Sequence, residues 1–172
     1  MLLDDSGSML FSDYAKAGEL QRQFSSVFSD PLSECVKEPT FSSPHINFSM
    51  DLDYLQPSED DFYSAISELN TNAGAGPDGI PAVLIKKCAA ALVAPLKYIW
   101  SESLNLGVVP LYFKVSHIHP LFKKGERAEA SNYRPISMTS HIIKIFERIL
   151  RKKIVFSLEQ NKILTPYQHG FM

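Results

Sequence analysis

The stretch NYRPIS at residues 132–137 restricts the backbone more tightly than any other part of the sequence. Pro135 has a fixed φ, and a residue that precedes proline avoids the helical region, so Arg134 is expected in an extended conformation. An arginine on a stiff strand presents its guanidinium in a defined direction, which suits an anionic ligand. The stretch is equally compatible with a strand edge beside a solvated charge, and alone it does not distinguish the two.

The composition allows one domain with a hydrophobic core. The chain has 172 residues, of which 45% are hydrophobic. Cys35 and Cys88 are far apart and are too few for a disulfide framework or a cysteine metal site. No window approaches the roughly 18 apolar residues of a membrane span, and Asp4 and Asp5 stand where a signal peptide carries positive charge. We therefore expect a soluble, intracellular protein without a membrane partner.

The small net charge of −2 conceals a strong asymmetry along the chain. Residues 1–109 contain 6 Lys or Arg and 15 Asp or Glu, a net charge of −9, whereas residues 110–172 have a net charge of +7. A basic segment of this kind indicates an anionic partner, most often nucleic acid, although a basic helix that simply faces water gives the same composition.

Residues 1–57 are predicted to form a leader that precedes a domain at residues 58–172. Within the leader, Ser12 can cap an amphipathic helix over residues 13–28, because apolar residues recur there at helical spacing. Residues 29–57 are rich in serine, proline and acidic residues without a sustained period, which predicts an extended or disordered linker.

Three helices are predicted next, over residues 58–70, 81–88 and 90–106. Ser58 and the acidic residues that follow it form a helix start, which explains the acidic cluster without a metal site. The glycine-rich loop at residues 72–81 lacks the Lys and Ser/Thr of a phosphate-binding loop, so it indicates a tight turn. Trp100 falls on an apolar stripe and is expected in the core rather than stacked on a base.

After Pro110 the periodicity changes, and residues 113–122 are predicted to form a short strand. His117 and His119 share one face of it and could supply two ligands of a metal site, but no third ligand is visible nearby. A loop and the return strand then place several cations around one tip. The last helix, over residues 140–159, is amphipathic and basic.

Five sequence blocks occur in an order that resembles the start of the reverse transcriptase domain of non-LTR retrotransposons. They are AGPDGIP at 75–81, LGVVP at 106–110, PLFKKG at 120–125, NYRPIS at 132–137 and QHGF at 168–171. The resemblance covers residues 58–172, and the helix at 13–28 is similar to the segment that links endonuclease and polymerase in those elements. Phe113 and Met138 replace the tryptophan and leucine usual in the family, with little change in volume.

The resemblance implies an α+β, helix-rich fold, namely the fingers subdomain of a right-hand polymerase with a small antiparallel β element, preceded by a partly disordered leader. In that family, aspartates of the palm hold two Mg²⁺ ions for nucleotide transfer. This sequence ends before those motifs. We therefore expect Mg²⁺ for the complete domain but none bound by this fragment, which should be inactive alone.

The resemblance also suggests roles for individual residues. Arg134 and one of Lys123 or Lys124 correspond to cations that hold the triphosphate of the incoming nucleotide. Template–primer contacts are assigned to the last block, at Gln168, Gly170 and Phe171. Further phosphate contacts are expected at Arg127, Arg148, Arg151 and Lys152. The implied partners are an RNA template, a DNA primer and deoxynucleoside triphosphates, in the nucleus or the cytoplasm.

Two hypotheses from other classes remain open. The basic half of the chain could act as a non-catalytic nucleic-acid-binding module that clamps a duplex. Alternatively, the chain could be a protein-interaction fragment, whose binding surface is an apolar face that a palm would otherwise cover.

Overall fold

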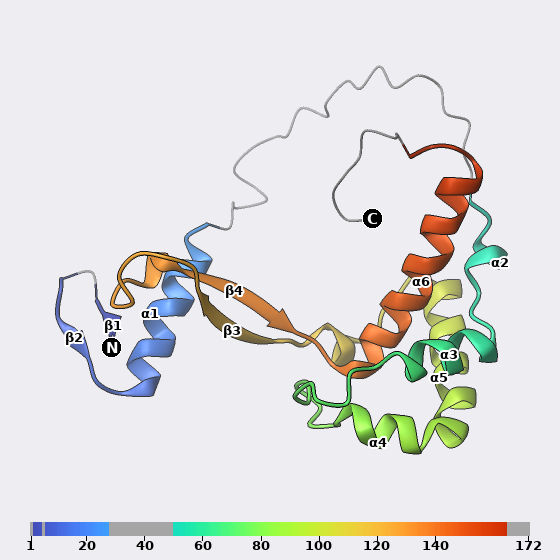
Figure 1. Cartoon of the computed structure of the whole chain (residues 1–172), viewed down its shortest axis with the longest axis horizontal. Helices are drawn as coiled ribbons and strands as arrows, with labels where there is room; N and C mark the ends of the chain where they lie inside the picture. The colour runs from blue at the N-terminus through green and yellow to red at the C-terminus, as the bar shows by residue number, and fades with distance from the viewer. Residues whose placement is uncertain (1, 5, 28–49, 165–172) are drawn as a thin grey trace. The chain divides into compact units, whose positions relative to one another are not determined.

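In a computed structural model of the chain, the described residues are 2–4, 6–27 and 50–164 (Figure 1). They form two compact units: one draws on Met1–Ser42 and Ile118–Met138, the other on Ser43–His117 and Thr139–Met172. The sequence-based boundary at residue 57 set a leader apart from a domain. In the structure, the helix of that leader packs within the same unit as residues from 118–138.

The first unit is built from a short β-hairpin, one helix and a longer β-hairpin. Strands β1 (Leu2–Leu3) and β2 (Met9–Leu10) pair antiparallel. Helix α1 (Asp13–Ser25) begins at Ser12, whose hydroxyl accepts a hydrogen bond from the backbone N–H of Ala15 at 3.1 Å. The predicted helix at 13–28 is thus confirmed, although it ends at Ser25. The apolar contacts of this unit join Leu2, Leu10, Leu20, Phe24, Ala130 and Tyr133.

The longer hairpin consists of β3 (His117–Phe122) and β4 (Tyr133–Met138), with the short 3-10 helix η2 (Ala130–Asn132) in its loop (Figure 1). Helix α1 contacts both β4 and η2. A strand–loop–strand element with Arg134 on the return strand was predicted, and the structure confirms it.

The predicted strand at 113–122 is wrong in its first part, where the 3-10 helix η1 (Leu111–Lys114) precedes β3. The carbonyl oxygen of Pro110 accepts a hydrogen bond from the N–H of Phe113 at 3.0 Å, which closes this helical turn. The ring of Phe113 lies 5.1 Å from that of Trp100. A tertiary contact with the helical core therefore overrides the local apolar pattern.

The second unit is helical in its described part. Its helices are α2 (Leu52–Leu55), α3 (Glu59–Ser67), α4 (Ala82–Lys87), α5 (Ala89–Leu106) and α6 (His141–Gln160). Helix α3 packs against α4, α5 and α6 (Figure 1). Trp100 is fully buried and stacks on Phe146 with ring centroids 4.1 Å apart, which confirms its predicted place in the core.

Several helix ends follow the local sequence signals. Ser58 and Asp61 form a reciprocal capping box at the start of α3, as predicted. Gly107, with φ of +64°, ends α5 in the left-handed conformation that glycine tolerates best. Helix α2, which begins after Asp51, falls in the predicted linker, so that part of the prediction is wrong. Residues 28–49, where the rest of the linker was expected, lie outside the described residues.

The described part of the chain is helix-rich with two small antiparallel sheets, in agreement with the predicted α+β class. None of its helices combines the length and the apolar character needed to cross a bilayer.

Candidate nucleotide and nucleic-acid interface

The β3–β4 hairpin carries the predicted triphosphate-binding residues, and its register determines which way they point. The backbone N–H of Lys123 donates to the carbonyl oxygen of Asn132 at 2.9 Å. The rings of Phe122 and Tyr133 meet edge to face with centroids 5.5 Å apart. Both observations pair Phe122 with Tyr133, and the two six-residue strands then pair from end to end.

This register places Pro120 opposite Pro135. Hydrogen-bonded and non-hydrogen-bonded pairs alternate along an antiparallel ladder, and the bond at Lys123 puts the proline pair at a non-hydrogen-bonded position. Proline has no N–H to donate, so at this position the ladder loses no hydrogen bond. A slip of one residue would put the two prolines in adjacent pairs of the ladder, so that one of them would occupy a position where an N–H donor is required. The two prolines therefore select the observed register.

The two faces of the hairpin have different surroundings. Ile118, Pro120 and Pro135 line a groove of about 550 Å³ against α1, and Leu20 and Phe24 line its opposite wall. Side chains alternate between the faces of a strand. Arg134 and Lys123 therefore lie on the outer face, away from α1.

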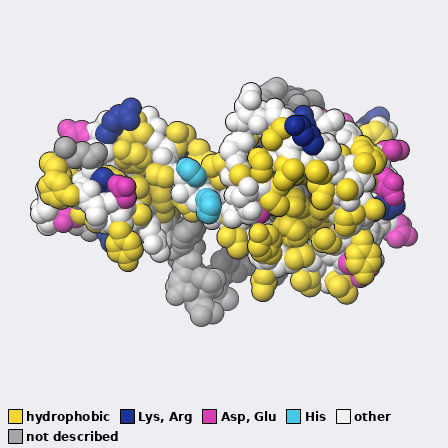
Figure 2. All heavy atoms as spheres, turned by 90° about the horizontal axis from the view of Figure 1, so that it is seen from below, with side chains coloured by type: hydrophobic (Ala, Val, Ile, Leu, Met, Phe, Trp, Pro, Cys, Tyr) yellow, Lys and Arg dark blue, Asp and Glu magenta, His cyan; other side chains and the backbone are white. Residues whose placement is uncertain are grey.

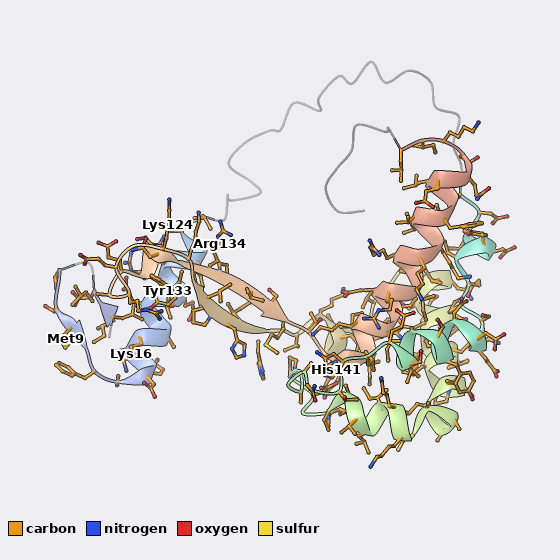
Figure 3. All side chains as sticks on the ribbon, viewed as in Figure 1. Met9, Lys16, Lys124, Tyr133, Arg134 and His141 are labelled. Carbon is orange, nitrogen blue, oxygen red and sulfur yellow. The ribbon has the colours of Figure 1, made fainter. Side chains whose placement is uncertain are left out.

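Arg134, Lys123 and Lys124 are all exposed. None of the three has a hydrogen bond or an ion pair with another side chain in the described residues. Figure 3 shows Lys124 in the loop of the hairpin and Arg134 near the beginning of β4. These charges are thus available to a ligand in solution.

The loop between the strands is held by Asn132, whose side-chain amide donates to the carbonyl oxygen of Glu126 and to Oε2 of Glu129, both at 3.0 Å. Gly125, at φ of +90°, lies so close that a Cβ there would be 2.6 Å from the Asn132 amide nitrogen. These contacts fix the loop that follows Lys123 and Lys124. Contacts among residues 126–132 thus determine the conformation of this loop, which the sequence alone did not predict.

Arg127, predicted to contact phosphate, is directed elsewhere. Its guanidinium carbon lies 4.5 Å from the centroid of the Phe122 ring, and its backbone carbonyl accepts a hydrogen bond from the Tyr133 hydroxyl at 2.8 Å. Phe122 is on the face opposite Arg134. The structure therefore does not bring Arg127 and Arg134 together on one face.

The cations of α6 are mostly engaged with acidic residues of α3. Arg148 donates to the carbonyl oxygen of Ala65 at 3.1 Å and has its Nε 3.7 Å from Oε2 of Glu68. Lys152 contacts the same carboxylate at 2.5 Å. The hydrogen bond from Lys152 lowers the pKa of Glu68, against a smaller opposing effect of burial. Arg151 is exposed and has no such partner in the described part of the chain.

Asp61 combines a capping role with an ion pair to Lys153 at 3.3 Å. Burial favours the neutral carboxyl, but the Ser58 backbone N–H, the Ser58 hydroxyl and Lys153 together lower the pKa of Asp61. The acidic cluster at the start of α3 is therefore explained by helix capping and by packing against α6.

The glycine-rich loop, whose role the sequence left unassigned, packs on the start of α6. Nε2 of His141 lies 3.1 Å from the carbonyl oxygen of Gly74, and His141 is buried (Figure 3). A Cβ on Gly76 would be 2.6 Å from the Cα of Ser140, the residue that caps α6. Sequence reasoning missed this contact, and the available signal was the glycine at 76 within AGPDGIP.

The remaining predicted site residues have no structural description, because Gln168, Gly170 and Phe171 lie outside the described residues. Within those residues, no group of three or more His, Cys, Asp or Glu side chains is arranged to hold a metal ion.

Comparison with known proteins supports a polymerase-related chain, although no protein-family model matches the sequence. The chain contains a region similar to the reverse transcriptases, or RNA-directed DNA polymerases, of non-LTR retrotransposons. This confirms the resemblance found in the five sequence blocks.

The relatives are Drosophila melanogaster proteins. The chain is 23% identical over 99% of its length to the "Probable RNA-directed DNA polymerase from transposon X-element". It is 25% identical over 78% to the corresponding probable enzyme "from transposon BS", and 24% identical over 90% to the "RNA-directed DNA polymerase from mobile element jockey". The matched region spans 19%, 15% and 17% of these proteins, respectively.

Proposed function

We propose that this chain supplies the fingers region of an RNA-directed DNA polymerase, where it holds the triphosphate of an incoming deoxynucleotide near an RNA template and a DNA primer. The observation that carries the proposal is the outer face of the β3–β4 hairpin, on which Arg134 and Lys123 are exposed and unpaired among the described residues. The similarity to three RNA-directed DNA polymerases supports the class of enzyme. The proposal places the chain inside the cell.

The register of the hairpin favours Lys123 over Lys124 as the second cation. Arg134 is paired with Leu121, and Lys123 is two residues further along β3, so Arg134 and Lys123 are diagonal neighbours on one face. Diagonal neighbours are about 7–8 Å apart, a distance that two long side chains bridge when they contact one polyphosphate. Lys124 is the next residue along the chain, so by the same alternation its side chain is expected on the opposite face of the hairpin. The triphosphate pair is therefore Arg134 and Lys123.

The two cations are suited to different parts of the ligand. The planar guanidinium of Arg134 can donate two parallel hydrogen bonds to phosphate oxygens, while Lys123 acts as a point charge. When a primer 3′-hydroxyl attacks the α-phosphorus, negative charge increases on the departing pyrophosphate. Cations placed at the β- and γ-phosphates stabilise that charge.

The described residues do not fit the metal centre of such an enzyme. Two-metal catalysis requires several carboxylates around one site, and the described residues contain no such group. Mg²⁺ would supply further charge neutralisation in a complete domain. We therefore assign no step of the reaction to a metal held by these residues.

A binding titration with matched neighbours tests the proposal. A fluorescent deoxynucleoside triphosphate is titrated with the purified chain and with Lys123→Ala, Lys124→Ala, Arg134→Ala and Arg127→Ala. A charge-assisted hydrogen bond contributes about 1.5–3 kcal/mol, so Arg134→Ala should weaken binding by about 10- to 150-fold. Lys123→Ala should also weaken it, with little effect from Lys124→Ala or Arg127→Ala. Equal binding by Arg134→Ala and the unmodified chain would contradict the proposal.

A second candidate function is non-catalytic binding of single-stranded nucleic acid. Exposed Arg151 on α6, which lacks an ion-pair partner in the described residues, favours it. In that case Arg151→Ala should weaken the binding of a single-stranded RNA, and free triphosphate should not compete with that RNA.

A further inference from the structure

The loop of the β3–β4 hairpin is bonded to the first strand of the chain, which is remote from it in the sequence. The backbone N–H of Leu3 in β1 donates to the carbonyl oxygen of Ala128 at 2.9 Å. Leu2, the neighbouring residue, is buried in one apolar cluster with Leu20 of α1 and Ala130 of η2. Strand β1 is therefore attached to this loop by a backbone hydrogen bond and by a shared apolar cluster.

The backbone beside each of the two proposed triphosphate ligands is bonded to the same loop. On one side, the N–H of Lys123 donates to the carbonyl oxygen of Asn132 at 2.9 Å. On the other side, Tyr133 precedes Arg134, packs against the apolar cluster that contains Leu2, and donates its hydroxyl proton to the carbonyl oxygen of Arg127 at 2.8 Å. The position of the loop thus affects the backbone at both cations.

A two-stranded hairpin needs neighbours of this kind. Alone in water such a hairpin is marginally stable at best, so its conformation depends on what packs against it. Helix α1 contacts β4 and η2, and β1 holds the loop at Ala128. When only a fraction of a protein has the conformation that binds a ligand, the apparent affinity falls by that fraction. Loss of a bond that holds the loop should therefore weaken binding even though no ligand contact is removed.

We propose that Leu3 is a positioning residue of the triphosphate site. Its N–H fixes the loop at Ala128, so that Lys123 and Arg134 are held where both reach one triphosphate. This inference rests on the function proposed above. It gives a role in nucleotide binding to residues that the sequence analysis assigned to a leader outside the domain.

The register of the first hairpin allows the N–H of Leu3 to be removed selectively. Leu3 is paired with Met9, and in the adjacent pair the N–H of Asp4 donates to the carbonyl oxygen of Ser8 at 2.9 Å. Because hydrogen-bonded and non-hydrogen-bonded pairs alternate, the N–H of Leu3 points away from Met9. Leu3→Pro therefore removes the donor to Ala128 without the loss of a bond between β1 and β2. Leu3→Ala is the matched variant, because it shortens the same side chain but keeps the N–H.

The affinity of the full chain for a fluorescent deoxynucleoside triphosphate is measured for the unmodified protein and for each variant. A net backbone hydrogen bond corresponds to about two- to tenfold in an equilibrium constant, so Leu3→Pro should weaken binding by about that factor, and Leu3→Ala should restore most of the loss. Figure 2 shows apolar side chains exposed on the surface of the first unit. Phe11, which is 81% exposed and follows β2, is a side chain of this kind, and Phe11→Ala should leave binding unchanged.

Hydrogen exchange measured by NMR reports on the loop in the absence of nucleotide. The N–H of Lys123 should exchange faster in Leu3→Pro than in Leu3→Ala, while circular dichroism shows that both variants are folded. A purely structural role of Leu3 would lower Tm and leave the Kd of the folded protein unchanged.

The variant Arg134→Ala separates failure of this inference from failure of the proposed function. If Arg134→Ala weakens binding while Leu3→Pro and Leu3→Ala bind equally well, the role of Leu3 is refuted and the triphosphate site stands. If Arg134→Ala binds as tightly as the unmodified chain, the triphosphate site is refuted, and the positioning role of Leu3 is refuted with it.

Discussion

Replacement of Gly76 by alanine is the most direct test of how the glycine-rich loop is held against α6. A Cβ at this position would lie 2.6 Å from the Cα of Ser140, 2.7 Å from the carbonyl oxygen of Thr139 and 2.9 Å from the N of Ser140. All three atoms belong to the backbone, so no change of side-chain rotamer relieves the overlap. Either the loop or the start of α6 must move.

The expected cost follows from overpacking. Insertion of one methyl group into a well-packed contact costs about 1–3 kcal/mol. Gly76 does not have positive φ, so the alanine backbone itself is unstrained and the cost arises from the close approach. For a chain of this size, 1 kcal/mol corresponds to about 2–4 °C in Tm. Gly76→Ala should therefore lower Tm by roughly 2–12 °C.

Gly74→Ala is the matched control two residues away. Nothing lies within 4 Å of a Cβ at Gly74, its φ is not positive, and its carbonyl oxygen remains available to His141. Alanine there should change stability by less than about 0.5 kcal/mol, or stabilise slightly. Both variants are compared by thermal melting followed by circular dichroism. Equal Tm values for Gly74→Ala and Gly76→Ala would refute the close approach of the loop to Ser140.

Three further predictions concern charge. In a chain fused to the remainder of a related polymerase, Arg134→Ala should raise the nucleotide KM or lower kcat/KM about 10- to 150-fold, with Arg134→Lys intermediate. A lower Tm with unchanged steady-state kinetics would indicate a purely structural arginine. The lowered pKa values of Glu68 and Asp61 stabilise the fold above their unfolded values of about 4, so Tm should fall as pH drops below about 4. Asp61→Asn should reduce that dependence. If Lys123, Lys124, Arg134 and Arg151 contact single-stranded RNA, the log–log salt slope of binding should be about −3, and a flat titration would exclude these contacts.

Structural features that depend only on residues close together in the sequence could be predicted from it. The capping box at Ser58 and Asp61 is one turn of helix, so its residue types alone indicated it. The extended conformation of Arg134 likewise follows from the proline beside it. By contrast, the turn at Leu111–Lys114 depends on the contact of Phe113 with Trp100, and no local pattern encodes that contact.

The candidate site was predictable in its residues but not in its geometry. The sequence identified Arg134 and two adjacent lysines, yet it could not distinguish Lys123 from Lys124, because the choice depends on the strand register. Arg127 was grouped with them, since a stacking contact with Phe122 cannot be read from composition. The packing of Gly74 and Gly76 on residues 139–141 joins segments more than 60 residues apart, and a single sequence carries no signal for such a distance.

Ion pairs within the fold neutralise part of the charge asymmetry of the sequence. They distinguish cations that hold the fold together from cations that are available to an anionic ligand, a distinction that composition alone does not make. Helix α6 contributes much of the positive charge of residues 110–172, but Arg148 and Lys152 are paired with Glu68, and Lys153 with Asp61, both from the acidic half of the chain. Those cations mainly hold α6 against α3. The cations of the β3–β4 hairpin have no such partners in the described residues. Anion binding should therefore depend mainly on cations that lack such a partner, as those of the hairpin do, whereas removal of the paired charges of α6, at Arg148, Lys152 and Lys153, should primarily affect stability.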